Sequence, residues 1–168
     1  LKIKTILQGY ENVIREDLLF HEFSGSSQYN KTNGTLVFLM AISSNFERYP
    51  ENDHYHSIWT VKDPFYINKD KEATEKLVYA FKKQNSVVPE TELVSFFNKI
   101  SQENASDRKI ILSYLGLHKA MGKNIFGEAG LVSWPQIRPK GIKDKAFLVL
   151  KRINKPLHFR EITASING

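Results

Sequence analysis

The stretch KNIFGEAGLVSW, Lys123–Trp134, decides how we interpret this chain. Two glycines interrupt it and apolar residues flank them, a pattern typical of two short strands joined by a tight turn. Upstream, residues 70–85, 90–100 and 106–117 each carry apolar side chains at helical spacing. Three short helices followed by a hairpin predict one compact unit.

Residues before position 68 follow the same order. We expect helices over 2–12 and 13–23, a third helix from Thr35 to about Tyr49, and a strand in HYHSIWTV, His54–Val61. The extended segments of the two halves end alike, in Ser-Ile-Trp at 57–59 and Val-Ser-Trp at 132–134. Three helices plus a hairpin describe a winged helix, so the predicted fold class is mainly α, with tandem winged-helix units.

The predicted domains are a first winged-helix-like unit over 1–67, a second over 68–134, and a linker with the start of a third unit over 135–168. Two prolines make the linker extended, and helices are expected over 141–153 and 157–166. We expect this third unit to be incomplete, because a further helix and a wing would have to follow.

Composition excludes several classes of protein. The 168 residues are 41% hydrophobic and 25% charged, as in soluble globular domains, and no apolar run approaches the roughly 20 residues that span a membrane. The absence of cysteine excludes disulfides, thiolate metal sites and cysteine nucleophiles, and it is compatible with the cytoplasm. We expect a cytoplasmic protein without a membrane partner.

Positive charge is concentrated near the C-terminus. The chain has 24 Lys and Arg against 18 Asp and Glu, and the whole excess of +6 falls within residues 135–168. Such a local field favours a polyanion, although a solvated helix face is the alternative interpretation. The predicted DNA-binding residues of this segment are Arg138, Lys140, Lys143, Lys145, Lys151 and Arg152.

The third helix of the second unit is a candidate recognition helix. Its outward side is expected to carry Ser113 and Gly116 together with cations, and Arg and Lys near a helix start suit contact with DNA. Ordinary capping and solvation explain the same residues equally well. The predicted DNA contacts of this unit are Arg108, Lys109, Lys119 and Lys123.

The third helix of the first unit lacks a polar stripe. Phe38 and Ile42 are expected opposite Leu36, Leu39 and Met40, which leaves an apolar outer face. We therefore predict that Phe38 and Ile42 contact a protein, with burial inside their own domain as the alternative.

Signals for catalysis are weak. His54 and His56 alternate on one strand, as in some metal sites, but only His21-Glu22 offers further ligands, and polar-face histidines are the more common case. We expect Trp59 and Trp134 to fill the core. The sequence has no phosphate-binding glycine loop, nucleophile elbow or dinucleotide fingerprint. We predict no enzyme, metal, cofactor or small-molecule substrate.

Two segments carry a family resemblance. GIKDKAFLVL (141–150) and KPLHFREI (155–162) resemble the start of a HARE-type helix-turn-helix module, and residues 122–137 resemble the lead-in to that module in bacterial RNA polymerase sigma-factor-like proteins. The resemblance implies DNA binding, contact with RNA polymerase subunits and a nucleoid-associated role in transcription. The promoter-reading sigma region and the second half of the HARE module are absent from this sequence.

The sequence-based hypothesis is therefore a DNA-binding transcription protein associated with bacterial RNA polymerase, either sigma-like or delta-like. Two alternatives stay open: the DNA-targeting region of a restriction or nuclease system, and a winged-helix scaffold that binds only protein. Double-stranded DNA and RNA polymerase subunits are the expected partners.

Overall fold

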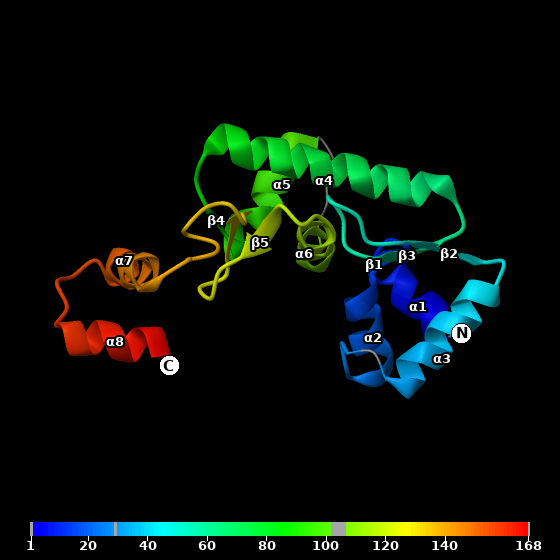
Figure 1. The fold of residues 1–168 in the computed structure, drawn as a ribbon. Coiled ribbons are helices and arrows are strands. Elements are labelled where there is room, and N and C mark those ends of the chain that lie inside the picture. The colour runs from blue at the N-terminus through cyan, green and yellow to red at the C-terminus, as the bar shows by residue number, and fades with distance from the viewer. Residues whose placement is uncertain (1, 29, 102–106, 168) are drawn as a thin grey trace.

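The structure, a computed structural model, describes residues 2–28, 30–101 and 107–167. It is mainly helical with two small antiparallel sheets, as predicted. Figure 1 shows an elongated molecule, with the N-terminus near one end and the C-terminus at the other.

The first half contains α1 (Lys2–Gln8), β1 (Val13–Arg15), α2 (Glu16–Ser24), α3 (Lys31–Ile42), β2 (Phe46–Tyr49) and β3 (Ile58–Val61). Its strands lie in the order β1-β3-β2. The second half contains α4 (Pro64–Gln84), β4 (Val88–Pro89), the 3-10 turn η1 (Glu90–Glu92), α5 (Leu93–Ser101), α6 (Arg108–Leu117), β5 (Met121–Lys123) and β6 (Glu128–Leu131). Its strands lie in the equivalent order, β4-β6-β5. The two halves thus share one topology.

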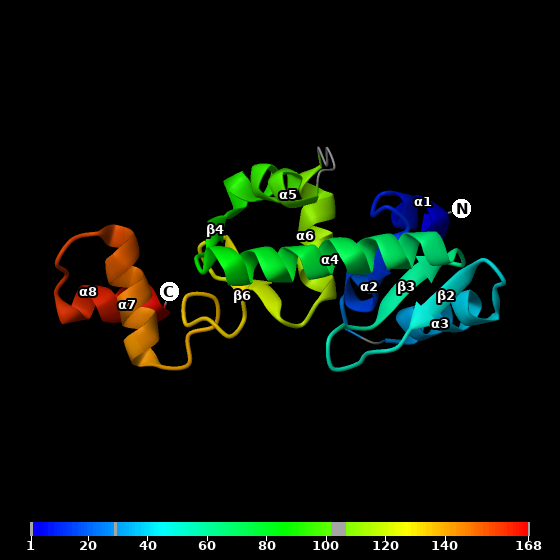
Figure 2. The ribbon, with the colours of Figure 1, turned by 90° about the horizontal axis from the view of Figure 1, so that it is seen from above.

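A helix pair follows, α7 (Ile142–Ile153) and α8 (Phe159–Asn167), as expected from the sequence. Asn154 ends α7 in the left-handed conformation, and the linker of residues 132–141 connects the second half to the pair (Figure 2). The prediction of an extended linker is wrong: the Ile137 and Arg138 amides both donate to the Trp134 carbonyl, so the chain turns there.

Several predicted boundaries in the first half are wrong. Val13 does not open a helix, because Val13–Arg15 pairs with β3. The third helix does not reach Tyr49: it ends at Ile42, and Phe46–Tyr49 forms β2 against β3. The strand expected from His54 is regular only from Ile58.

Helix boundaries also follow caps that the apolar pattern does not mark. Asn30 accepts a hydrogen bond from the Asn33 amide, so α3 begins before Thr35. Asp63 caps α4 in the same way, so this helix begins at Pro64 rather than near Asp70, and the predicted boundary at 67/68 falls inside it. Ser106, the other half of the cap expected before α6, lies outside the described residues.

The first sheet is covered on both faces because successive side chains of a strand point to opposite sides. Ile14 and Trp59 pack with α1, α2 and α3 in one core cluster. Val13 and Ile58 pack on the other side, in a cluster that also contains α4, α5 and α6. Trp59 fills the core as predicted and donates to Glu16 Oε2 at 2.8 Å. The second of these two clusters therefore joins the halves through α4.

Candidate nucleic-acid interface

Two of the predicted DNA-binding cations pair with one carboxylate inside their own unit. Asp107 accepts from the Lys109 amide at 2.8 Å and so fixes the start of α6. From there Arg108 forms an ion pair with Glu90, and Lys123 Nζ lies 3.2 Å from the other Glu90 oxygen. Hydrogen bonds from Arg108 and Lys123 hold the pKa of Glu90 below its ordinary value. These ion pairs connect α6, η1 and strand β5 of the hairpin.

The other two cations of this group contact the first half. Lys109 Nζ lies over the Tyr10 ring, 4.1 Å from its centroid, and Lys119 Nζ is 2.6 Å from Glu51 Oε1. Each side chain thus has an intramolecular partner across the boundary between the halves. Hydrogen bonding to Lys119 lowers the pKa of the Glu51 carboxyl.

The expected outward face of α6 is covered by the first half. Ser113, predicted to point outward, is 7% exposed, so that prediction is wrong. Gly116 accepts a hydrogen bond from Arg15 Nη1 at 3.2 Å, and Tyr114 donates to Glu11 at 2.8 Å. The Arg15 guanidinium is itself oriented by Asp17.

The chain segments beside α6 are also joined. The His56 amide donates to the Leu117 carbonyl at 3.1 Å, and the Lys119 amide donates to the His54 carbonyl at 2.8 Å. These bonds lie on either side of the bridge between Tyr55 and His118, so the contact between the halves continues past the C-terminal end of α6.

The two histidines considered as metal ligands lie beside a third that the sequence pattern did not connect with them. His118 is 6% exposed, its ring centroid is 6.0 Å from that of His54, and its Nδ1 accepts from the Ala120 amide. Burial lowers the pKa of His118, against the opposing effect of Glu75, and it lowers the pKa of His56 as well. Within the described residues, no group of three or more His, Cys, Asp or Glu side chains is arranged to hold a metal.

The cations of the C-terminal segment are placed differently. All six predicted residues are exposed. Among the described residues, none of the six has a carboxylate oxygen within 4 Å of its side-chain nitrogens. Their charge is available to an external anion.

These cations do not form a single stripe on α7. At about 100° per residue, Lys143 and Lys151 are about 80° apart, and Lys145 and Arg152 share the opposite side. Leu148 and Val149, both buried, mark the side of Lys145 and Arg152 as the one packed toward the rest of the protein. The outer pair, Lys143 and Lys151, lies on the other side of α7, and Lys151 also borders a hollow of about 120 Å³ that Glu128 and Gln136 line.

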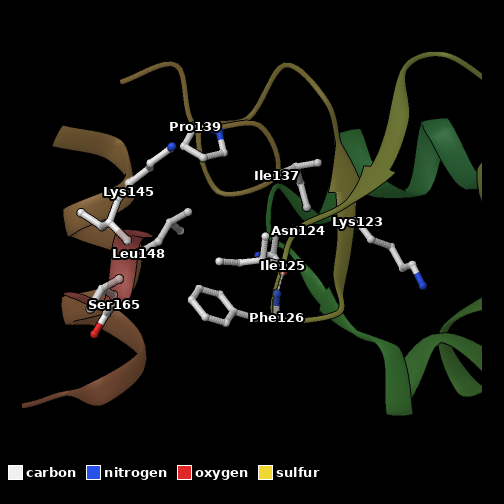
Figure 3. A pocket seen from close by; sticks show the side chains of 11 residues that line it. Lys123, Asn124, Ile125, Phe126, Ile137, Pro139, Lys145, Leu148 and Ser165 are labelled. Carbon is white, nitrogen blue, oxygen red and sulfur yellow. Dashed lines mark hydrogen bonds between the residues drawn. The ribbon is translucent and has the colours of Figure 1, made fainter. Parts of the chain in front are cut away.

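A pocket of about 200 Å³ lies between the tip of the β5–β6 hairpin and the helix pair (Figure 3). Ile125 and Phe126 line it from the hairpin, and Lys145 and Leu148 line it from α7. The Arg152 guanidinium lies over the Phe126 ring, 4.7 Å from its centroid. Charge clustering in the sequence predicts the cations around this pocket, but no sequence signal indicates the pocket itself.

The apolar face of α3 is present in the structure. Phe38 is 63% exposed and Ile42 is 66% exposed, while Leu36 and Met40 are buried on the other side. Leu39, expected with the buried residues, is 53% exposed and extends the apolar face, so its predicted placement is wrong.

Comparison of the chain with protein-family models, with curated proteins and with solved structures finds no match. In the described part of the chain, none of the helices has the length and apolar character needed to cross a membrane.

Proposed function

We propose that this chain is a tandem array of winged-helix units that binds double-stranded DNA as an accessory part of the bacterial transcription machinery. Support for the winged-helix assignment comes from the repeated order helix, strand, two helices and two strands, with the last strand in the centre of each sheet. In each half the helix before the hairpin occupies the place of a recognition helix.

The observation that carries the proposal is the exposed, unpaired charge of the C-terminal segment. Arg138, Lys140, Lys143 and Lys151 are exposed and have no described carboxylate within ion-pairing distance of their side chains. Lysine and arginine side chains placed in this way release counterions from phosphates, and that release supplies most sequence-independent affinity for DNA.

The spacing of the outer pair suits a duplex backbone. Lys143 and Lys151 are eight residues apart on α7, which is about 12 Å along the helix. That distance corresponds to roughly three to four base pairs at about 3.4 Å per phosphate of one strand. The first half docks on protein in this proposal, through the apolar α3 face of Phe38, Leu39 and Ile42.

The polymerase as partner, and transcription as the process, rest on the resemblance of residues 122–137 and 141–162 to sigma-factor-like proteins and their HARE-type modules. The contacts around α6 limit what the second half does in this proposal. Arg108, Lys109, Lys119 and Lys123 act as structural cations, and the C-terminal segment supplies the contacts with phosphate.

One rival function has a specific observation in its favour. Because α6 is covered and its cations are paired internally, a scaffold that binds only protein accounts for the two halves without DNA. That rival gives the exposed C-terminal cations no role in affinity for DNA.

A salt titration distinguishes the DNA-binding function from the scaffold that binds only protein. The full chain is titrated with a random 20-bp duplex at several salt concentrations, and about four phosphate contacts give a slope of log affinity against log salt near −3.6. The triple variant Lys140→Gln, Lys143→Gln, Lys151→Gln makes the slope shallower by about 2.7.

The matched control replaces three exposed lysines elsewhere by glutamine, Lys62, Lys83 and Lys99, with the same change in net charge. The control retains the wild-type slope within about 1. Absence of binding at low salt, or an equal effect of the two triple variants, refutes the proposal and favours the scaffold.

A further inference from the structure

The tip of the β5–β6 hairpin is held rigidly and presents apolar side chains to solvent. Gly127, at φ 77°, donates its amide to the Asn124 carbonyl at 3.0 Å and closes a four-residue turn. The side-chain oxygen of Asn124 accepts from the amides of Phe126 and Glu128, and its nitrogen donates to the Gln136 carbonyl. The positions of Ile125 and Phe126 are therefore fixed before anything binds.

Ile125 is the most exposed large apolar side chain of the described residues, at 85%. It lies at the centre of this turn and lines the pocket of about 200 Å³ opposite Leu148 (Figure 3). An apolar side chain on a hairpin tip gains free energy only when something covers it. The charged side chains around the pocket indicate which kind of ligand covers Ile125.

The pocket has the features of a site for one nucleobase. Phe126 and Leu148 line both this pocket and a neighbouring hollow of about 120 Å³, which is also bordered by two cations, Lys151 and Arg152, and by the carboxylate Glu128. Arg152 covers one face of the Phe126 ring, and aromatic rings and guanidinium planes are both surfaces on which bases stack. Lys145 borders the same pocket, with its nitrogen on the side of Pro139 (Figure 3), and supplies a cation for the phosphate of the same nucleotide.

We infer that this pocket accepts one unpaired base of a DNA strand, with apolar contacts from Ile125, Phe126 and Leu148 and with the adjoining phosphate at Lys145. The inference rests on the proposed function, because it names the form of DNA that the C-terminal segment prefers. The outer lysines hold the duplex in this account, and the pocket selects DNA that has an unstacked base.

Three 20-bp probes test it: a perfect duplex, the same duplex with one extra unpaired thymine, and the same duplex with an abasic residue in place of that thymine. The abasic probe retains the bend and the extra phosphate and lacks only the base. Because base stacking on an aromatic side chain contributes about 5- to 150-fold per base, the full chain binds the thymine probe about tenfold more tightly than the abasic probe.

Two of the variants are at exposed positions and the third is a conservative change at the half-buried Phe126, so that folding is retained. Ile125→Ser removes the apolar contact, and Ser165→Trp occludes the pocket from the surface of α8. Phe126→Leu retains volume and removes the aromatic face. Each variant brings the thymine-to-abasic ratio to within about twofold of one and leaves affinity for the perfect duplex unchanged. Ile142→Ser, which changes an exposed apolar residue of α7 outside the pocket, retains the tenfold ratio.

The outcomes separate the two proposals. A wild-type ratio near one, or a tenfold ratio retained in both Ile125→Ser and Ser165→Trp, overturns the base pocket while binding to the perfect duplex still supports the proposed function. Failure to bind any of the three probes refutes the proposed function and this inference together. Thermal melts by circular dichroism confirm that each variant is folded.

Discussion

Shortening one side chain of α4 should destabilise both halves of the protein together. Ile67 and Leu77 are 2% and 0% exposed, and both belong to the core cluster that contains Val13 and Ile58 from the first sheet. Truncation of a buried Ile or Leu to alanine costs about 2–5 kcal/mol, because the methyl groups lose their contacts and a cavity remains. For a chain of this length that cost lowers the melting temperature by about 4–20 °C.

The two tryptophans allow each half to be followed separately. Trp59 reports on the first sheet, and Trp134, packed against Phe81, reports on the second half. Each is observed alone, in a protein where the other is replaced by phenylalanine, during a thermal melt followed by fluorescence. We expect Ile67→Ala and Leu77→Ala to lower both midpoints equally.

The control is Asn68→Ala, a change at an exposed position of the same helix, which shifts either midpoint by little because exposed substitutions contribute within about 0.5 kcal/mol. A Leu77→Ala protein whose Trp134 midpoint falls while its Trp59 midpoint stays in place would show that the halves unfold independently. That result refutes the reasoning from a shared core.

Three further predictions concern His118, the β5–β6 turn and the exposed face of α3. The pKa of His118 is lowered by burial, so the unfolded chain binds a proton at this histidine before the folded chain does as the pH falls below about 6.5. The free energy of unfolding in urea should therefore decrease below that pH. The decrease should be less steep in His118→Asn, which keeps an acceptor for the Ala120 amide. Asn124→Ala leaves the Phe126 and Glu128 amides without their acceptor and lowers the free energy of unfolding by about 1–3 kcal/mol. Gly127→Ala lowers it by about 1–2 kcal/mol, because alanine is strained at the positive φ of this position. Denaturant midpoints measure both changes. The double variant Phe38→Ser, Ile42→Ser should melt within about 4 °C of wild type, because two exposed substitutions contribute at most about 1 kcal/mol, and a larger fall would mean that α3 packs internally.

The sequence was most informative where local chemistry determines structure. The hairpin around Gly127, the helix after Asp107 and the pair α7 and α8 follow from turn residues, caps and apolar spacing, and all are present in the structure. Each of these signals lies within a few residues of the element that it specifies.

The elements that were missed depend on distant partners. Val13–Arg15 is only three residues long and becomes a strand by pairing with residues 58–60. No glycine or proline separates Ile42 from Phe46, so the end of α3 is set by the pairing of β2 with β3. Short strands of this kind have no periodicity of their own.

The candidate site, like the fold, could be predicted only where the signal lies in the local sequence. Clustering of charge near the C-terminus is visible in the sequence, and the structure leaves those cations exposed. The burial of α6 is not visible, because it depends on contacts such as Arg15 with Gly116 and Glu11 with Tyr114, about a hundred residues apart in the chain. The pocket of about 200 Å³ likewise forms between a hairpin and a helix pair that only the tertiary structure brings together.

Protection of lysines from acylation by bound duplex tests the central claim most directly. The full chain is acylated with and without a saturating 20-bp duplex at low salt, and the modification of each lysine is quantified by mass spectrometry. We expect several-fold protection of Lys140, Lys143 and Lys151 and unchanged modification of Lys109 and Lys119, whose partners lie within the protein. Protection of Lys109 and Lys119 with the C-terminal lysines unaffected would contradict it.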